Sequence, residues 1–164
     1  MSEVDVVIKR IEPQCALTLR RTFATWEAVS QVGKEVGNAL ASHQIKPLGP
    51  FMGIYYGEAF TFEDFDFELV LPVDDDQTED VPLESAGTLQ LHQLPTLEMA
   101  ATHLHQGDLT GLSAKFVPVQ RWADENGYKL RGVTRIIHHR GPMHAVDPAD
   151  YLTELQHEIE KAEC

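Results

Sequence analysis

The chain has 164 residues, of which 43% are apolar, and this is enough to bury the core of one compact domain or of two tightly packed halves. Its formal net charge of −13 repels phosphate backbones, which argues against direct binding of nucleic acid, and no apolar run approaches the roughly twenty residues that a membrane span needs. The 2 cysteines, Cys15 and Cys164, lie far apart without CxxC spacing, so we expect a cytoplasmic protein without a disulfide framework.

The sequence resembles itself at an offset of 83 residues, the distance from Asp5 to Thr88. Residues 5–11 align without a gap with residues 88–94, and residues 43–49 align with residues 126–132. A unit of this length that recurs once predicts two similar modules packed about a pseudo-two-fold axis, with a seam between them. We expect a single domain over 1–164, with a first module at about 1–73, an acidic linker at about 74–86 and a second module at about 87–164.

The first module is predicted to contain two strands, one helix and two further strands. Alternation of apolar and polar residues favours a hairpin, with a turn at Glu12-Pro13-Gln14 between its strands. The helix is expected to begin after Thr25, a suitable N-cap, and to end before His43, with Trp26, Val29, Val32, Val36 and Leu40 at helical spacing. The strands are expected at 5–11, 16–20, 51–56 and 65–71.

The second module is predicted to repeat this order after the acidic run at 74–80, which is expected to be a solvated linker. Its helix is expected to start near Asp108, with Leu109, Leu112, Phe116, Val119 and Trp122 on one stripe. Pro118 should kink this helix or start a second segment, because proline removes a backbone hydrogen bond. The strands are expected at 88–94, 99–104, 134–139 and 151–159.

Alternation along each strand also assigns the side chains to two faces of the sheet. In the closing strand of each module, the more apolar face belongs under the helix, and Glu68 and Glu154 then occupy equivalent positions on the opposite face. Ile54 and Ile137 are expected to point toward the helices. The residues then expected around the two glutamates are Tyr55, His138, Ala16 and Ala101, with Tyr56 and His139 beneath them or at an edge.

A cleft with aromatic walls and one or two placed carboxylates is typical of a site for an amphipathic cation. We therefore expect a ligand groove at the seam. The alternative is an ordinary polar solvent face, which an antiparallel sheet with helices on one side also presents. His103 and His105 would share a strand face, as two metal ligands would, but no third ligand has a recognisable spacing, so no metal site or cofactor is expected.

Four stretches resemble the GyrI-like effector-binding domains, which form the drug-sensing half of bacterial multidrug regulators and the gyrase-inhibitory protein that names the group. These stretches, in order along nearly the whole chain, are residues 7–14, 53–56, 122–128 and 147–156. The resemblance implies a pseudo-symmetric α+β fold with a groove between the repeats. In this family the groove takes up hydrophobic, often cationic or polyaromatic, small molecules.

The resemblance also implies roles for single residues. In the regulators, a glutamate on the last long strand pairs with the positive charge of the ligand, and Glu154 falls on that position. The pocket tyrosine of the family corresponds to Tyr55 or Tyr56, and strand alternation favours Tyr55. Phe51 and Trp122 are candidates for aromatic walls, although Trp122 also fits the core stripe of its helix. The regulators carry a DNA-binding helix-turn-helix ahead of this domain, so we expect a freestanding version that reads no operator itself.

Three functions stay open from the sequence. The first is a receptor or sequestering protein for an amphipathic, cationic compound, with Glu154 as a counter-ion whose pKa is raised while the site is empty. The second, implied by hydrolase-like members of the family, is hydrolysis of strained electrophilic natural products, with Glu154 as base and Tyr55 as acid, aided by Glu68 or His138. The third is a protein-interaction role through the acidic stretches at 63–66 and 74–80, and a homodimer also stays open.

Overall fold

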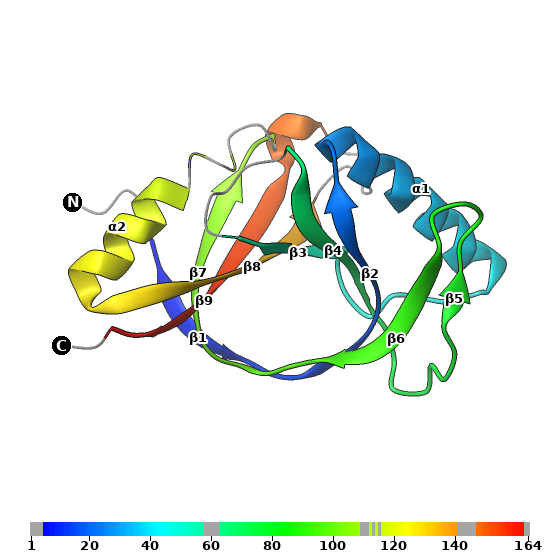
Figure 1. The fold of residues 1–164 in the computed structure, drawn as a ribbon, viewed down its shortest axis with the longest axis horizontal. Helices are drawn as coiled ribbons and strands as arrows, with labels where there is room; N and C mark the ends of the chain where they lie inside the picture. Colours follow the sequence, from blue (N-terminus) through cyan, green and yellow to red (C-terminus); the bar gives the residue numbers. More distant parts are fainter. Residues whose placement is uncertain are drawn as a thin grey trace.

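The structure is a computed structural model that describes residues 5–57, 63–108, 112, 114, 116–140 and 147–162. It has an α+β fold, in which nine antiparallel strands form one open sheet in the order β1-β7-β9-β8-β3-β4-β2-β6-β5. Figure 1 shows the sheet as an arch, with α1 and α2 above its two shoulders and with β1 and β6 along its base. The α+β class, the antiparallel sheet and the helices on one side agree with the sequence prediction.

The described elements run strand-strand-helix-strand-strand twice, with one short strand between the two sets. The first set is β1 (Val7–Ile11), β2 (Gln14–Phe23), α1 (Trp26–Ser42), β3 (Met52–Tyr56) and β4 (Phe65–Pro72). The short strand is β5 (Val81–Pro82). The second set is β6 (Thr88–Leu94), β7 (Leu97–Gln106), α2 (Phe116–Asn126), β8 (Tyr128–Arg140) and β9 (Leu152–Lys161), with a 3₁₀ turn at Pro148–Asp150 before β9.

The two sets exchange their first strands. β1 pairs with β7 of the second set, and β6 pairs with β2 of the first set. The predicted hairpin between the first two strands is therefore wrong, because alternation along a strand indicates which side chains share a face but not which strand is the neighbour. Since β1 and β6 each join the opposite half, neither half of the sheet is complete without the other.

Helix α1 begins and ends where the sequence predicts. The Oγ1 atom of Thr25 accepts a hydrogen bond from the backbone N–H of Ala28 at 3.2 Å, and the backbone N–H of His43 bonds the carbonyl of Ala39 at the other end. The buried side of the helix packs on the sheet in a core that includes Val29, Val32, Val36, Leu17, Phe67, Leu71, Ile136 and Leu155.

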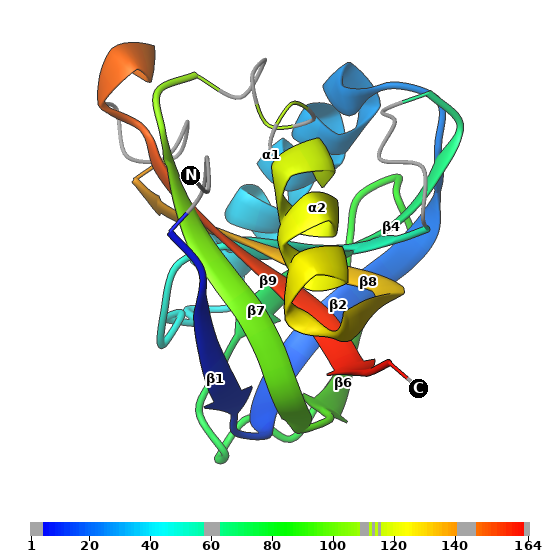
Figure 2. The ribbon, with the colours of Figure 1, turned by 90° about the vertical axis from the view of Figure 1, so that its left-hand side faces the viewer.

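Helix α2 is shorter than predicted, because it begins at Phe116 and not near Asp108. Leu109 lies outside the described residues. Pro118 is the third residue of α2. Backbone N–H groups in the first turn of a helix make no hydrogen bond within the helix, so a proline, which lacks this group, is tolerated there. Val119 and Ala123 are fully buried, and Figure 2 shows the helix lying over the end of the sheet that contains β8 and β9.

The acidic side chains of the run at 74–80 are exposed, as predicted for a solvated segment. The end of the predicted linker differs, since Val81 and Leu83 belong to the core under the helices and β5 pairs with β6. Burying these two apolar side chains stabilises a segment that its acidic neighbours alone could not order. Among the described residues, neither helix has the length and apolarity that crossing a membrane requires.

Candidate functional site

Strand register divides the side chains of the sheet between two faces. Glu68 lies opposite Ile54, and Glu154 lies opposite Ile137. Directly opposed residues of antiparallel strands point to the same side of the sheet. Met52 lies opposite Ile137 on β8, and it lies two residues before Ile54 on β3, so Ile137 and Ile54 also point to the same side. Both glutamates therefore lie on the side away from the helices, which we call the glutamate face; the other side is the helix face.

Tyr55 and His138 lie on the helix face, so their predicted placement beside the glutamates is wrong. Tyr55 lies opposite Phe67, is 2% exposed and stacks against Phe65 at 6.2 Å between ring centroids. His138 lies opposite Thr153. The prediction assumed that apolar side chains mark the helix face. A second apolar cluster on the glutamate face, which consists of Ala16, Met52, Ile54, Val70, Leu94 and Ile137, removes that distinction.

The two predicted alanines lie on different faces. Ala16 is on the glutamate face, whereas Ala101 is on the helix face, opposite to the prediction. The residue that matches Ala16 in the second module is Ala100, because Ala16 pairs with His92 and Ala100 pairs with Lys9, which are 83 residues apart. The repeat is thus displaced by one residue in this strand, and a shift of one residue moves every side chain to the other face.

The two predicted wall residues lie on the helix side of the sheet. Phe51 packs against the core under the helices. Trp122 stacks on Tyr128, with 5.5 Å between ring centroids and 4° between ring planes, where the end of α2 meets β8. Their position favours packing roles, and a part in ligand binding stays a prediction for both.

Glu68 is the centre of a hydrogen-bonded cluster on the glutamate face. It is 6% exposed, and the Tyr56 hydroxyl donates a hydrogen bond of 2.6 Å to its Oε1 atom. The Arg20 guanidinium lies 3.6 Å from the centre of the Tyr56 ring and donates to Asp66 at 2.7 Å and 3.0 Å. Burial and the bond to Glu68 raise the pKa of Tyr56, so the phenol stays protonated and keeps its role as a donor.

Glu154 has the exposed side chains of Lys9 and His139 as partners in place of a phenol. Its side chain is 12% exposed, and its oxygens lie 2.9 Å from His139 Nε2, 2.9 Å from Gln156 Nε2 and 3.6 Å from Lys9 Nζ. Burial acts to raise the pKa of Glu154, but the hydrogen bonds from Gln156 and His139 and the charge of Lys9 outweigh it and hold the pKa below its usual range. The expected raised pKa is therefore wrong, and the carboxylate is ionised at neutral pH.

Two of the three partners of Glu154 are exposed side chains. The Lys9 side chain is 48% exposed and the His139 side chain is 39% exposed, so both can move into solvent. A cation that reaches Glu154 would meet an ionised, nearly buried carboxylate beside the apolar side chains of Ile137 and Met52. Both apolar side chains are themselves buried, with 7% of Ile137 and 8% of Met52 exposed.

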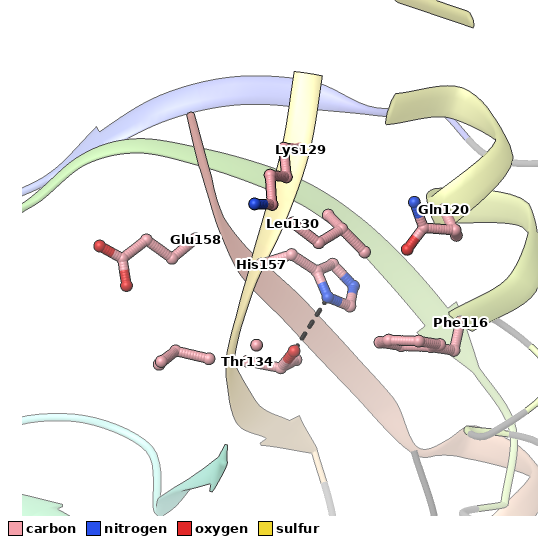
Figure 3. Close-up of a pocket in the computed structure, with 9 residues that line it drawn as sticks. Phe116, Gln120, Lys129, Leu130, Thr134, His157 and Glu158 are labelled. Atoms are coloured by element: carbon pink, nitrogen blue, oxygen red, sulfur yellow. Dashed lines mark hydrogen bonds between the residues drawn. The ribbon is translucent and has the colours of Figure 1, made fainter. Parts of the chain in front are cut away.

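The sequence did not predict a second feature, a hollow of about 200 Å³ between α2 and the sheet. Figure 3 shows Phe116 and Gln120 from α2 on one side of it and His157 from β9 on the other. The one sequence signal for it is Gly132, which precedes the predicted strand at 134–139 but lies inside β8, where a glycine often marks a bulge. Among the residues that the structure describes, no group of three or more His, Cys, Asp and Glu side chains is placed to hold a metal ion.

Comparison with known proteins finds solved structures with the same fold. No protein-family model matches the chain, and no curated protein matches it significantly. Solved structures do match, among them the C-terminal domain of EcmrR, with a TM-score of 0.76 and 20% identity over 98% of this chain and 99% of that chain. EcmrR in its complex with DNA gives a TM-score of 0.83 and 17% identity over 99% of this chain, which spans only 59% of the EcmrR chain.

Two further structures share the fold. One is a hydrolase encoded by lin2189 from Listeria innocua, with a TM-score of 0.67 and 11% identity over 97% of this chain and 93% of that chain. The other is SAV2435 bound to tetraphenylphosphonium, with a TM-score of 0.60 and 10% identity over 95% of this chain and 94% of that chain. The resemblance to GyrI-like domains is thus confirmed for the fold.

Proposed function

We propose that this protein binds amphipathic small molecules that are cationic or polyaromatic, with Glu154 as the counter-ion. The observation that carries the proposal is the state of Glu154, an ionised carboxylate that is nearly buried and that pairs with the exposed side chains of Lys9 and His139. If a ligand cation displaces Lys9, the ion pair between Glu154 and the ligand is less solvated than the ion pair between Glu154 and Lys9. The attraction between the charges is therefore stronger in the pair with the ligand.

The apolar cluster of the glutamate face supplies the second half of the proposed site. Ile137 lies directly opposite Glu154, and Met52 lies directly opposite Ile137. A methionine adapts its shape to aromatic rings of different geometry and contacts them favourably through its sulfur. The tetraphenylphosphonium complex of SAV2435, a protein of the same fold, supports a lipophilic cation as the ligand class.

Calorimetric titration with tetraphenylphosphonium and with triphenylphosphine oxide tests the proposal, because the second compound has similar rings and no net charge. We expect the cation to bind about tenfold more tightly, which corresponds to one partly desolvated ion pair. Equal affinities would show that the carboxylate does not select the charge. If neither compound binds, lipophilic cations are excluded as the ligand class.

Hydrolysis is the second candidate, and the structure changes the residues that it would use. Glu154 and Tyr55 lie on opposite faces and cannot act together as base and acid. The tyrosine and glutamate that do meet are Tyr56 and Glu68, at 2.6 Å. Turnover of a strained cyclopropane electrophile that is lost in both Tyr56→Phe and Glu68→Gln would favour this function; turnover that survives both changes would exclude the pair.

We further infer that the two modules act as one binding unit in the cytoplasm, since their first strands are exchanged between the halves. A protein partner and a homodimer remain proposals, and the exposed acidic run at 74–80 is the surface that supports a partner. Direct binding of DNA or RNA is not proposed, because the net charge of −13 opposes it.

A further inference from the structure

A large apolar side chain lies exposed directly beside the carboxylate of Glu154. Leu104 on β7 lies opposite Glu154 on β9, so its side chain is on the glutamate face, and it is 58% exposed. Val7 on β1 is also exposed on this face, because it lies opposite Thr102, two residues before Leu104. The two side chains leave apolar surface in water next to a nearly buried carboxylate, and a bound molecule would cover that surface.

An arginine stands in the first half of the sheet where Leu104 stands in the second. Arg20 lies directly opposite Glu68. Its guanidinium lies 3.6 Å from the centre of the Tyr56 ring and is fixed there by two hydrogen bonds to Asp66, at 2.7 Å and 3.0 Å. The first half thus supplies its own cation, which covers the ring beside its carboxylate.

The second half lacks both members of that ion pair. Leu104 replaces Arg20, and Leu152, two residues before the glutamate of β9, replaces Asp66. Leu152 is partly buried and lies on the glutamate face, because side chains two residues apart on a strand share a face. The carboxylate of Glu154 is therefore bordered by apolar side chains where the carboxylate of the first half is bordered by a fixed ion pair.

The cation that the second half does have is held loosely. Strands β1, β7 and β9 lie side by side (Figure 2), and the half-exposed Lys9 side chain extends from β1 across β7 to a distance of 3.6 Å from Glu154. When Lys9 leaves, the two oxygens of Glu154 keep their contacts of 2.9 Å with His139 Nε2 and Gln156 Nε2. A ligand therefore has to supply positive charge and apolar surface, but no hydrogen-bond donor.

We propose that Leu104, with Val7 beside it, is the apolar contact of the cation site, and that Arg20 fills the matching place in the first half. Leu104 thereby selects ligands whose charge is surrounded by rings, and the chain binds one such ligand. This inference rests on the proposed function at Glu154, to which it adds the side chains that contact the rings of the ligand and the number of ligands for each chain.

Calorimetric titration of Leu104→Asn with tetraphenylphosphonium and with triphenylphosphine oxide tests the contact. Asparagine has a similar size but is polar, so both compounds should bind about fivefold more weakly, because they share the rings that Leu104 contacts. Leu48→Asn is the matched control. Leu48 is 59% exposed and lies between α1 and β3, beside the end of β4, and its replacement should change neither affinity by more than about twofold.

A second pair of variants places the arginine of the first half in the second half. In Leu104→Arg the new guanidinium lies opposite Glu154 and should abolish binding of tetraphenylphosphonium, with the thermal unfolding transition retained because the position is exposed. Leu48→Arg adds the same charge at an equally exposed position. It should keep the wild-type affinity within about twofold.

The failure of this contact and the failure of the counter-ion give different results. Glu154→Gln should weaken only the cation, whereas Leu104→Asn should weaken both compounds. Unchanged affinities in Leu104→Asn, cation binding that survives Leu104→Arg, or two cations bound to each wild-type chain would overturn the proposal. Affinity for the cation that falls in Leu104→Asn but not in Glu154→Gln would retain Leu104 and reject the counter-ion, and a wild-type protein that binds neither compound would overturn both.

Discussion

The Nε2 atom of His139 lies 2.9 Å from the Oε1 atom of Glu154, and Tyr56, at the matching position of the first module, contacts Glu68 in the same way at 2.6 Å. The two halves of the sheet thus hold one carboxylate each in the same frame. Each carboxylate also has an exposed imidazole near it, since His92 Nε2 lies 3.7 Å from Glu68 Oε2, so the difference between the two sites is the Tyr56 phenol, whose raised pKa keeps it a donor to Glu68. We therefore propose a structural role for Glu68 and a ligand role for Glu154.

Removing the Tyr56 hydroxyl should destabilise the fold. Tyr56→Phe takes away the donor at 2.6 Å from a carboxylate that is 6% exposed, and an unsatisfied buried acceptor costs about 1–3 kcal/mol. Urea unfolding measures the change in the free energy of unfolding. Tyr128→Phe is the matched control, because Tyr128 contributes the stacking of its ring on Trp122, which phenylalanine keeps. Equal stability of the two variants would contradict the role given to Tyr56.

Two glycine substitutions should act in opposite directions. A Cβ atom on Gly53 would lie 2.7 Å from Cε2 of Phe67, which is 1% exposed, so Gly53→Ala should cost about 1–3 kcal/mol of overpacking. Gly33 lies inside α1 with no atom within 4 Å of an added Cβ, and Gly33→Ala should stabilise the fold by about 0.5–1 kcal/mol. Thermal unfolding midpoints of the two variants, one below and one above the wild type, are the expected result.

Stability should fall in acid because of His157. Burial, and then the neighbouring His103, lower its pKa to about 3 in the folded protein, against about 6.5 in an unfolded chain, so below pH 6.5 the unfolded chain gains a proton that the folded protein does not. The contribution of the neutral ring is complete above pH 6.5 and is lost toward pH 3 at about 1.4 kcal/mol per pH unit.

Urea unfolding between pH 7.5 and pH 5 measures this slope. His157→Gln should flatten the pH dependence, whatever it does to stability at pH 7.5, and His43→Gln at the exposed end of α1 should keep the slope of the wild type. A wild-type slope in His157→Gln would show that the buried ring is not the group responsible.

Local chemistry made some elements predictable from the sequence. Thr25 marks the start of α1 because its side chain can cap the first turn, and the structure has that hydrogen bond. The strand at 88–94 coincides with β6. Glu68 and Glu154 lie on the predicted face because each alternates with side chains that pack under the helices, Phe67 and Leu155 among them.

Long-range contacts were not predictable in this way. The exchange of β1 and β6 depends on partners that no local pattern specifies. Alternation predicts the wrong face for Tyr55 because the sheet buries apolar side chains on both faces near β3 and β8. The hollow beside α2 depends on the bulge between Leu130 and Thr134, and Gly132 was its one local sign.

The most direct test of the proposed function is the affinity of Glu154→Gln for tetraphenylphosphonium, measured by calorimetry beside Glu160→Gln. Both changes remove one carboxylate charge from β9, but Glu160 is far more exposed and pairs with Arg131. We predict that Glu154→Gln weakens binding about tenfold and that Glu160→Gln changes it by less than about twofold. Equal affinity of the two variants would contradict the assignment of Glu154 as the counter-ion of the ligand.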